Sequence, residues 1–106
     1  MIALTAQEIA PRLAALTGWQ IEEGELTRTF SFKDFLAALA FVNRVGEQAE
    51  KAGHHPDIDI RYNKVSLWLV THDAGAPSDR SSSLGWEAGG LTAKDFDLAA
   101  VIDRLL

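Results

Sequence analysis

Residues 57–72 read DIDIRYNKVSLWLVTH, in which apolar and polar side chains alternate on both sides of Asn63-Lys64. Alternation with a period of two is typical of half-buried strands, and asparagine tolerates the positive φ of a tight hairpin turn. The stretch therefore predicts a β-hairpin in which the numbers of directly opposed residues sum to 127, as 63 and 64 do. This register places His55 opposite His72, with both side chains on one face.

The two faces of this predicted hairpin differ in chemistry. The face expected to meet the core carries Ile58, Ile60, Tyr62, Val65, Leu67, Leu69 and Thr71. The other face is mostly polar and carries His55, Asp57, Asp59, Arg61, Ser66, Trp68, Val70 and His72. Such one-sided burial is expected of an antiparallel sheet that helices cover on a single face.

A second alternating stretch, residues 19–32, predicts another hairpin around a two-residue turn at Glu23-Gly24. In that register the numbers of directly opposed residues sum to 47, so Ile21 faces Leu26.

The longest helix is expected at residues 33–52, with Asp34 or Ser31 as its N-cap and Gly53 as its stop. One apolar line at helical spacing consists of Phe35, Leu39, Val42, Gly46 and Ala49. A second line consists of Ala38, Phe41, Val45 and Ala52. The width of this apolar sector has two interpretations, a broad core face or a contact between subunits.

Two shorter helices are expected at capping boxes near the ends of the chain. Thr5 and Glu8 mark the first, although Pro11 means that this helix is either kinked or begins later. Thr92 and Asp95 mark the last, whose apolar side carries Phe96, Leu98, Val101, Ile102 and Leu105.

The resulting element order, α-β-β-α-β-β-α, favours an α+β fold. The expected architecture is a four-stranded antiparallel sheet with three helices packed on one face. The 106 residues fit a single domain.

Composition narrows the function classes. A net charge of -5 and a pI near 5.0 argue against nucleic acid as a direct partner, because phosphate binding needs a clustered positive surface. The chain has no cysteine for disulfides or thiolate metal sites. Its N-terminal residues resemble neither a signal peptide nor a membrane span, so we expect a cytoplasmic protein without membrane contact.

All three histidines fall in two places, His54-His55 and His72. Histidine can both donate and accept a proton at neutral pH, so convergence of the two places would create an acid/base site. Two alternatives are a metal site, completed by Asp57, Asp73 or Glu50, and an unrelated set of two surface histidines and one at a strand end. Against the metal site, adjacent histidines rarely point at one ion, and no known ligand spacing is present.

Several segments together resemble the signature of the pterin-4a-carbinolamine dehydratase family: EKAGHHPD at 50–57, YNKV at 62–65 and THD at 71–73. The resemblance extends to GW at 18–19, FSFKDF at 30–35, GLT at 90–92 and Asp95. His-His-Pro by itself would be weak evidence, but its combination with the other segments is specific.

The resemblance implies a function and an assembly. Members of the family dehydrate 4a-hydroxytetrahydropterins, which form when aromatic amino acid hydroxylases turn over, to the quinonoid dihydropterin. They contain a four-stranded antiparallel sheet with three helices on one side, form dimers or tetramers, and require no metal or bound cofactor. The natural pterin side chain is left open.

By the same resemblance, His54, His55 and His72 are the catalytic positions. We assign His54 and His72 to proton transfer and His55 mainly to binding and orienting the substrate. The expected substrate-site residues are Glu50, Trp19 and Asp95. Glu50, one helical turn before His54, is expected to accept its ring N–H. The alternatives are a solvated carboxylate for Glu50, a core position for Trp19 and a helix cap for Asp95.

The chain departs from the family pattern at residues 76–89, which are inserted shortly after His72. The insertion has two interpretations, a lid over the pterin or a disordered excursion.

A different class of function is a non-catalytic dimerisation or regulatory binding protein of the same fold. Retention of all three histidines favours catalysis, because a scaffold does not need imidazoles at these spacings.

Overall fold

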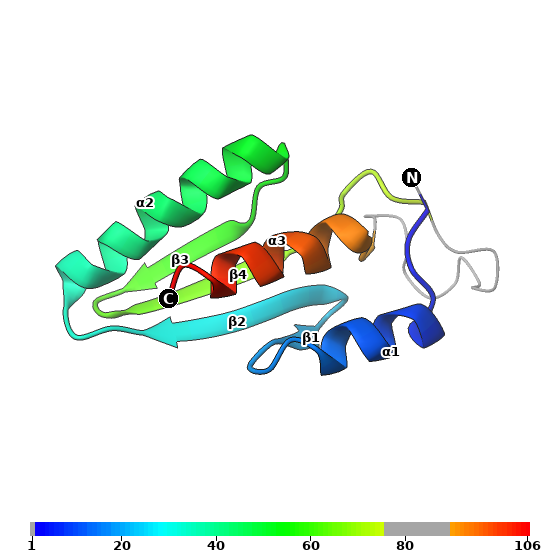
Figure 1. Ribbon diagram of the computed structural model, residues 1–106, viewed down its shortest axis with the longest axis horizontal. Helices are drawn as coiled ribbons and strands as arrows, with labels where there is room; N and C mark the ends of the chain where they lie inside the picture. Colours follow the sequence, from blue (N-terminus) through cyan, green and yellow to red (C-terminus); the bar gives the residue numbers. More distant parts are fainter. Residues whose placement is uncertain (1, 76–89) are drawn as a thin grey trace.

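The structure, a computed structural model, describes residues 2–75 and 90–106. Its elements are α1 (Ala6–Ala14), β1 (Gln20–Glu22), β2 (Glu25–Ser31), α2 (Phe35–Ala52), β3 (Asp57–Arg61), β4 (Lys64–Leu69) and α3 (Ala93–Asp103), shown in Figure 1. The predicted order and the α+β class are confirmed. The predicted insertion at 76–89 lies outside the described residues.

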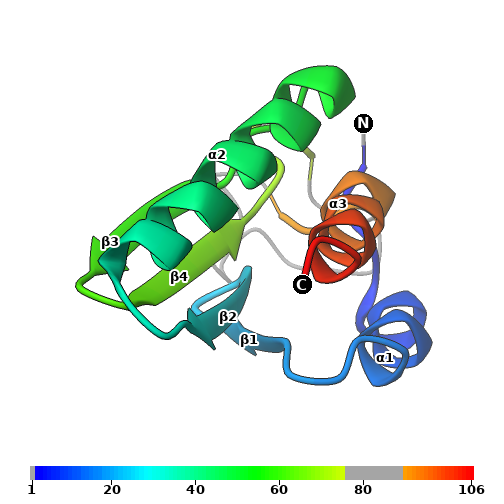
Figure 2. The same cartoon turned by 60° about the vertical axis from the view of Figure 1, so that its left-hand side comes forward.

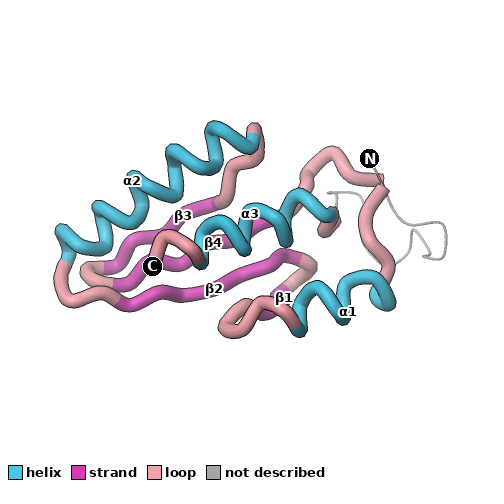
Figure 3. The backbone as a smooth tube through the Cα atoms, in the orientation of Figure 1, coloured by secondary structure: helices cyan, strands magenta, loops and turns pink. Residues whose placement is uncertain are grey.

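The four strands form one antiparallel sheet in the order β1-β2-β4-β3. Figure 2 looks along the sheet and shows α2 and α3 next to each other on the same face, with α1 beyond α3 near β1; Figure 3 shows the same layers as a tube. The fully buried part of the core comprises Leu26, Ala38, Phe41, Val45, Val65, Leu67, Leu69, Ala99 and Ile102. Along the described residues no helix is long and apolar enough to cross a membrane.

The first hairpin has the predicted register, with Ile21 paired to Leu26. Its turn residues Glu23 and Gly24 both adopt positive φ, 51° and 80°. Two consecutive positive φ values are what a two-residue turn matched to the twist of the strands requires.

The second hairpin differs from the prediction by two residues. Its turn is Tyr62-Asn63. The residue numbers of the observed pairs Ile58–Leu67 and Ile60–Val65 sum to 125, whereas the predicted register required 127. A two-residue shift leaves each strand residue on its predicted face, because side chains alternate with a period of two. The alignment of His55 with His72 is nevertheless wrong.

A contact with Phe32, the residue that follows β2, explains the shift. The Asn63 side chain donates to the Phe32 carbonyl at 2.7 Å, and the Phe32 amide donates to the Asn63 carbonyl at 2.9 Å. These bonds hold Asn63 as the second turn residue, and Tyr62 takes the left-handed position with a φ of 53°. Tyr62 is therefore exposed instead of facing the core, as the sequence predicted.

The helix ends follow the expected chemistry. Asp34 caps α2 by accepting from the amide of Ala37 at 2.8 Å, and Gly53 ends it in the left-handed conformation. The capping box of Thr5 starts α1, so the alternative of a later start is wrong, and Pro11 lies inside the helix. The carbonyl that Pro11 leaves without a partner belongs to exposed Gln7, where water can satisfy it.

An arginine shares the core face of the sheet with apolar neighbours and forms a polar cluster there. Arg28 donates to Asp103 at 2.9 Å and lies 4.6 Å from the centre of the Phe30 ring. The indole of Trp19 donates to the same carboxylate at 2.9 Å. Gly18, at a φ of 92°, allows this approach, because a Cβ there would lie 3.0 Å from the guanidinium.

We predict that Asp103→Ala lowers the free energy of unfolding by about 1–3 kcal/mol, because it leaves the Trp19 and Arg28 donors without their acceptor. Urea denaturation followed by tryptophan fluorescence measures the change. Asp97→Ala on the same helix is the control, since it makes the same exchange of aspartate for alanine at an exposed position. Equal stability of the two variants would contradict this account of the cluster.

Candidate active site

His54 follows immediately after the C-terminus of α2. Gly53 turns the chain with a φ of 63°, and the His54 amide donates back to the Ala49 carbonyl at 3.1 Å. Glycine at this position allows the left-handed turn that ends many helices. The helix end therefore fixes the place from which the His54 side chain projects.

The His54 imidazole reaches α3 and contacts a buried carboxylate. Its Nε2 lies 2.5 Å from Oδ1 of Asp95, which is completely inaccessible to solvent. The His54 side chain is 11% exposed, so one edge of the ring remains accessible. The contact joins residues 41 positions apart in the sequence.

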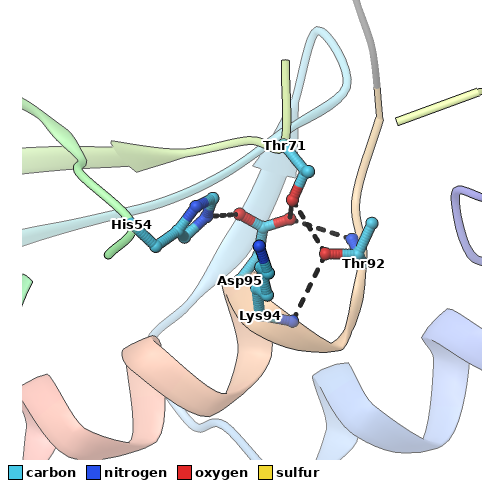
Figure 4. A network of polar contacts seen from close by, with 5 residues as sticks. All are labelled: His54, Thr71, Thr92, Lys94 and Asp95. Carbon is cyan, nitrogen blue, oxygen red and sulfur yellow. Dashed lines mark hydrogen bonds and ion pairs between the residues drawn. The ribbon is translucent and has the colours of Figure 1, made fainter. Parts of the chain in front are cut away.

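The second oxygen of Asp95 is held by two threonines (Figure 4). Oδ2 accepts from the Thr71 hydroxyl and from the backbone amide of Thr92, both at 2.9 Å. The two hydroxyls also contact each other at 2.8 Å, and the amide of Lys94 donates to Thr92 Oγ1 at 3.3 Å. Because the single Thr71 proton is directed to Asp95, Thr92 is the donor in the contact between the hydroxyls.

This arrangement specifies a tautomer of His54. An ionised carboxylate accepts hydrogen bonds and donates none, so all three groups around Asp95 must donate to it. The proton of neutral His54 is therefore on Nε2, which leaves Nδ1 with a free lone pair. His54 is thus positioned as a proton acceptor through Nδ1.

Glu50 contacts His55 instead of His54, so the predicted partner was wrong. Its Oε1 lies 2.5 Å from Nε2 of His55, and the side chains of His55 and Glu50 are 60% and 79% exposed. The turn at Gly53 sends consecutive histidines in different directions. His54 meets α3, whereas His55 returns to the last turn of α2.

Two further predicted residues lie elsewhere. His72 is exposed and directly follows Thr71, whose hydroxyl belongs to the Asp95 network. Trp19 is buried and bonds Asp103 at the far end of α3, about 12 Å along the helix axis from Asp95 at 1.5 Å per residue. Within one chain, Trp19 is therefore not brought to the histidines.

An open cleft of about 350 Å³ lies between α2 and α3, next to His54. It is lined by Gln48, Lys51, Ala52, His54, Lys94, Asp97, Leu98 and Val101. Its volume falls at the lower end of the range found for small-molecule sites. In the part of the chain that the structure describes, no group of three or more histidine, aspartate or glutamate side chains could hold a metal ion.

Thr71 is a site residue to which the sequence analysis assigned no role. It lies on the core face after β4, where a hydroxyl needs a buried partner. The sequence did contain a signal. Thr71 ends a row of core-facing apolar residues, Val65, Leu67 and Leu69, and a threonine at such a position indicates a buried polar network.

Comparisons with known proteins identify the family of the chain. A family model described as Pterin 4 alpha carbinolamine dehydratase matches residues 2–105. The chain belongs to this family. The resemblance identified in the sequence is thereby confirmed.

Individual relatives of the dehydratase family match along nearly the whole chain. A protein from Acidobacterium capsulatum, named as a pterin-4-alpha-carbinolamine dehydratase, is 53% identical to this chain over 106 residues. The alignment covers 100% of each of the two chains. A protein of the same name from Chloroflexus aurantiacus is 50% identical, with 100% of this chain and 99% of the relative covered.

Two solved structures have related folds. A crystal structure described as a transcriptional coactivator/pterin dehydratase from Brucella melitensis has a TM-score of 0.78 and 33% identity, with 97% of each chain covered. A pterin dehydratase-like protein described as a RuBisCO assembly factor in the alpha-carboxysome has a TM-score of 0.55. At 22% identity, over 82% of this chain and 84% of that one, it shows similarity of fold alone.

We predict that Thr71→Val lowers the free energy of unfolding by about 1–3 kcal/mol, because buried Asp95 loses a donor and the Thr92 hydroxyl loses its acceptor. Urea denaturation measures the loss. Thr29→Val is the matched control, since Thr29 also contacts a hydroxyl at 2.8 Å, that of Ser66, but on the exposed face of the sheet. A Thr71→Val loss no larger than that of the control would contradict the importance of the network.

Proposed function

We propose that this protein dehydrates 4a-hydroxytetrahydropterin to the quinonoid dihydropterin by histidine acid/base catalysis. The observation that carries the proposal is His54, held by buried Asp95 beside an open cleft in a chain of the dehydratase family. Among the described residues, His54 Nδ1 has no hydrogen-bond partner. The reaction suits imidazoles because it moves two protons. One proton joins the C4a hydroxyl, which leaves as water with the electrons of the C–O bond, and the other leaves the ring nitrogen.

The two transfers are divided between His54 and His72. Nδ1 of His54 accepts the proton from the ring nitrogen, since its Nε2 proton is committed to Asp95. His72, exposed next to the Asp95 network, donates to the departing hydroxyl. His55, held by Glu50, binds and orients the substrate. In this role the protein serves the recycling of a pterin cofactor used by an aromatic amino acid hydroxylase in the cytoplasm.

We predict that His54→Ala and His72→Ala each lower the enzyme-catalysed dehydration rate by about 100-fold or more, after the uncatalysed rate is subtracted. This factor is the usual contribution of a general acid or base. Stopped-flow absorbance of enzymatically generated 4a-carbinolamine measures the rate. His55→Ala should raise KM more than it lowers kcat, because its role is in binding. Equal rates in the wild type, His54→Ala and His72→Ala would contradict the proposal.

The alternative, a non-catalytic dimerisation or regulatory protein, is favoured by one observation. The N-terminal half of α2 presents Phe35 and Leu36 to solvent beside half-buried Leu39 and Val42. An exposed apolar stripe on a helix is typical of a protein contact. Equal rates in the kinetic experiment would make this alternative the better account.

We also propose that the same stripe joins copies of this chain into a homodimer or homotetramer. A symmetric contact would bury the stripe against itself, as two-fold assemblies commonly do. Ala38, Phe41 and Val45 of the second line and Ala49 of the first are buried in the core of the same chain. The exposed side chains of Phe35 and Leu36, with half-buried Leu39 beside them, therefore remain for a partner.

We predict that Leu36→Lys shifts the protein toward the monomer in size-exclusion chromatography with light scattering, because it places a charge in the apolar contact. Leu106→Lys is the matched control, since Leu36 and Leu106 are similarly exposed, at 73% and 63%, but lie on different elements. An unchanged molar mass for Leu36→Lys would show that α2 does not form the contact.

A further inference from the structure

The cleft between α2 and α3 has a charge opposite to that of the chain. Lys51 and Lys94 line it, and Asp97 is the only acidic residue among the described residues of its lining, whereas the whole chain has a net charge of -5. Apolar Ala52, Leu98 and Val101 supply the rest of its wall, together with Gln48 and His54. A cleft with one apolar wall and an excess of cations suits a ligand with a flat ring and an anionic group.

Within residues 2–75 and 90–106, neither lysine has its charge neutralised by a neighbour. No ion pair among the described residues involves Lys51 or Lys94. Glu50, adjacent to Lys51 on α2, is engaged with His55. Asp97 lies one helical turn from Lys94, yet the two form no ion pair. Both ammonium groups therefore remain available to a ligand.

Both lysines lie close in the sequence to His54 or to its partner Asp95. Lys51 precedes His54 by three residues, and Lys94 directly precedes Asp95. A ring that binds at His54 would thus have its substituent within reach of long side chains from two helices. Lysine acts as a flexible point charge, so it can bind a carboxylate or a phosphate without strict geometry.

We propose that the pterin substrate carries an anionic substituent, a carboxylate or a phosphate, that Lys51 and Lys94 bind at the cleft. The proposal rests on the proposed function, because it names the kind of pterin that the same site takes. It also predicts the effect of Asp97: its carboxylate repels the substituent, so its removal should strengthen binding of anionic pterins.

Titration of binding by pterin fluorescence tests the proposal without turnover. The probes are pterin-6-carboxylate against 6-methylpterin, and neopterin monophosphate against neopterin. We expect the wild type to favour the anionic member of at least one pair by about three- to tenfold, since each exposed ion pair contributes about 0.2–1 kcal/mol. The pair with the larger preference identifies carboxylate or phosphate.

The variants locate the effect. In the double variant Lys51→Met/Lys94→Met the ratio of anionic to neutral affinity should fall to about one, whereas Asp97→Asn should raise it. The control Lys33→Met/Lys64→Met removes the same charge from exposed sites outside the cleft and should keep the wild-type ratio. Raising the salt concentration should reduce the wild-type ratio, because salt screens exposed charges.

Three results would overturn the proposal: a wild-type ratio near one in both pairs, no binding of any pterin, or an equal fall of the ratio in the control. Failure of the proposed function is a different result. In that case the wild-type protein would not accelerate the dehydration of 4a-carbinolamines, whether the pterin is neutral or anionic. Dehydration of neutral pterins without an anionic preference would overturn this inference alone.

Discussion

The buried carboxylate of Asp95 is the group on which the rest of the site depends. Removing a charge from water is costly unless hydrogen bonds replace the lost solvation. Asp95 receives three such bonds, and each comes from a different part of the chain. His54 follows α2, Thr71 follows β4, and the Thr92 amide begins α3. A single carboxylate therefore joins the ends of three elements that are distant in the sequence.

The two oxygens of Asp95 serve different purposes. Oδ2 completes the capping box of α3 and binds Thr71, which fastens the helix to the end of the sheet. Oδ1 orients the imidazole of His54. Because both oxygens belong to one rigid group, the position of the helix sets the position of the ring. A site built in this way is held in place by the same bonds that hold the fold together.

The sequence predicted what depends on local pattern. The strands followed from alternation, the ends of the helices from Thr5, Asp34, Gly53 and Thr92, and the first register from the turn at Gly24. These features involve residues a few positions apart. The second register was wrong by two residues because alternation cannot distinguish such a shift, and the deciding bonds of Asn63 come from distant Phe32.

At the candidate site the sequence did not predict which side chains pair. It named His54 and Asp95 as site residues, but it gave His54 the nearby Glu50 as a partner. The partner of His54 lies 41 residues away, and the turn at Gly53 directs the two histidines apart. Trp19 was expected near the histidines but bonds Asp103, a contact across 84 residues that no local spacing reveals.

The tautomer of His54 tests the central claim most directly. Long-range ¹H–¹⁵N correlation spectra of the ¹⁵N-labelled protein, at a pH where the ring is neutral, distinguish protonated from unprotonated ring nitrogens. The account predicts a proton on Nε2 and a free Nδ1 in the wild type, and a mixture of both tautomers in Asp95→Asn, whose amide can donate as well as accept. A proton on Nδ1 in the wild type, or identical spectra of His54 in the two proteins, would contradict it.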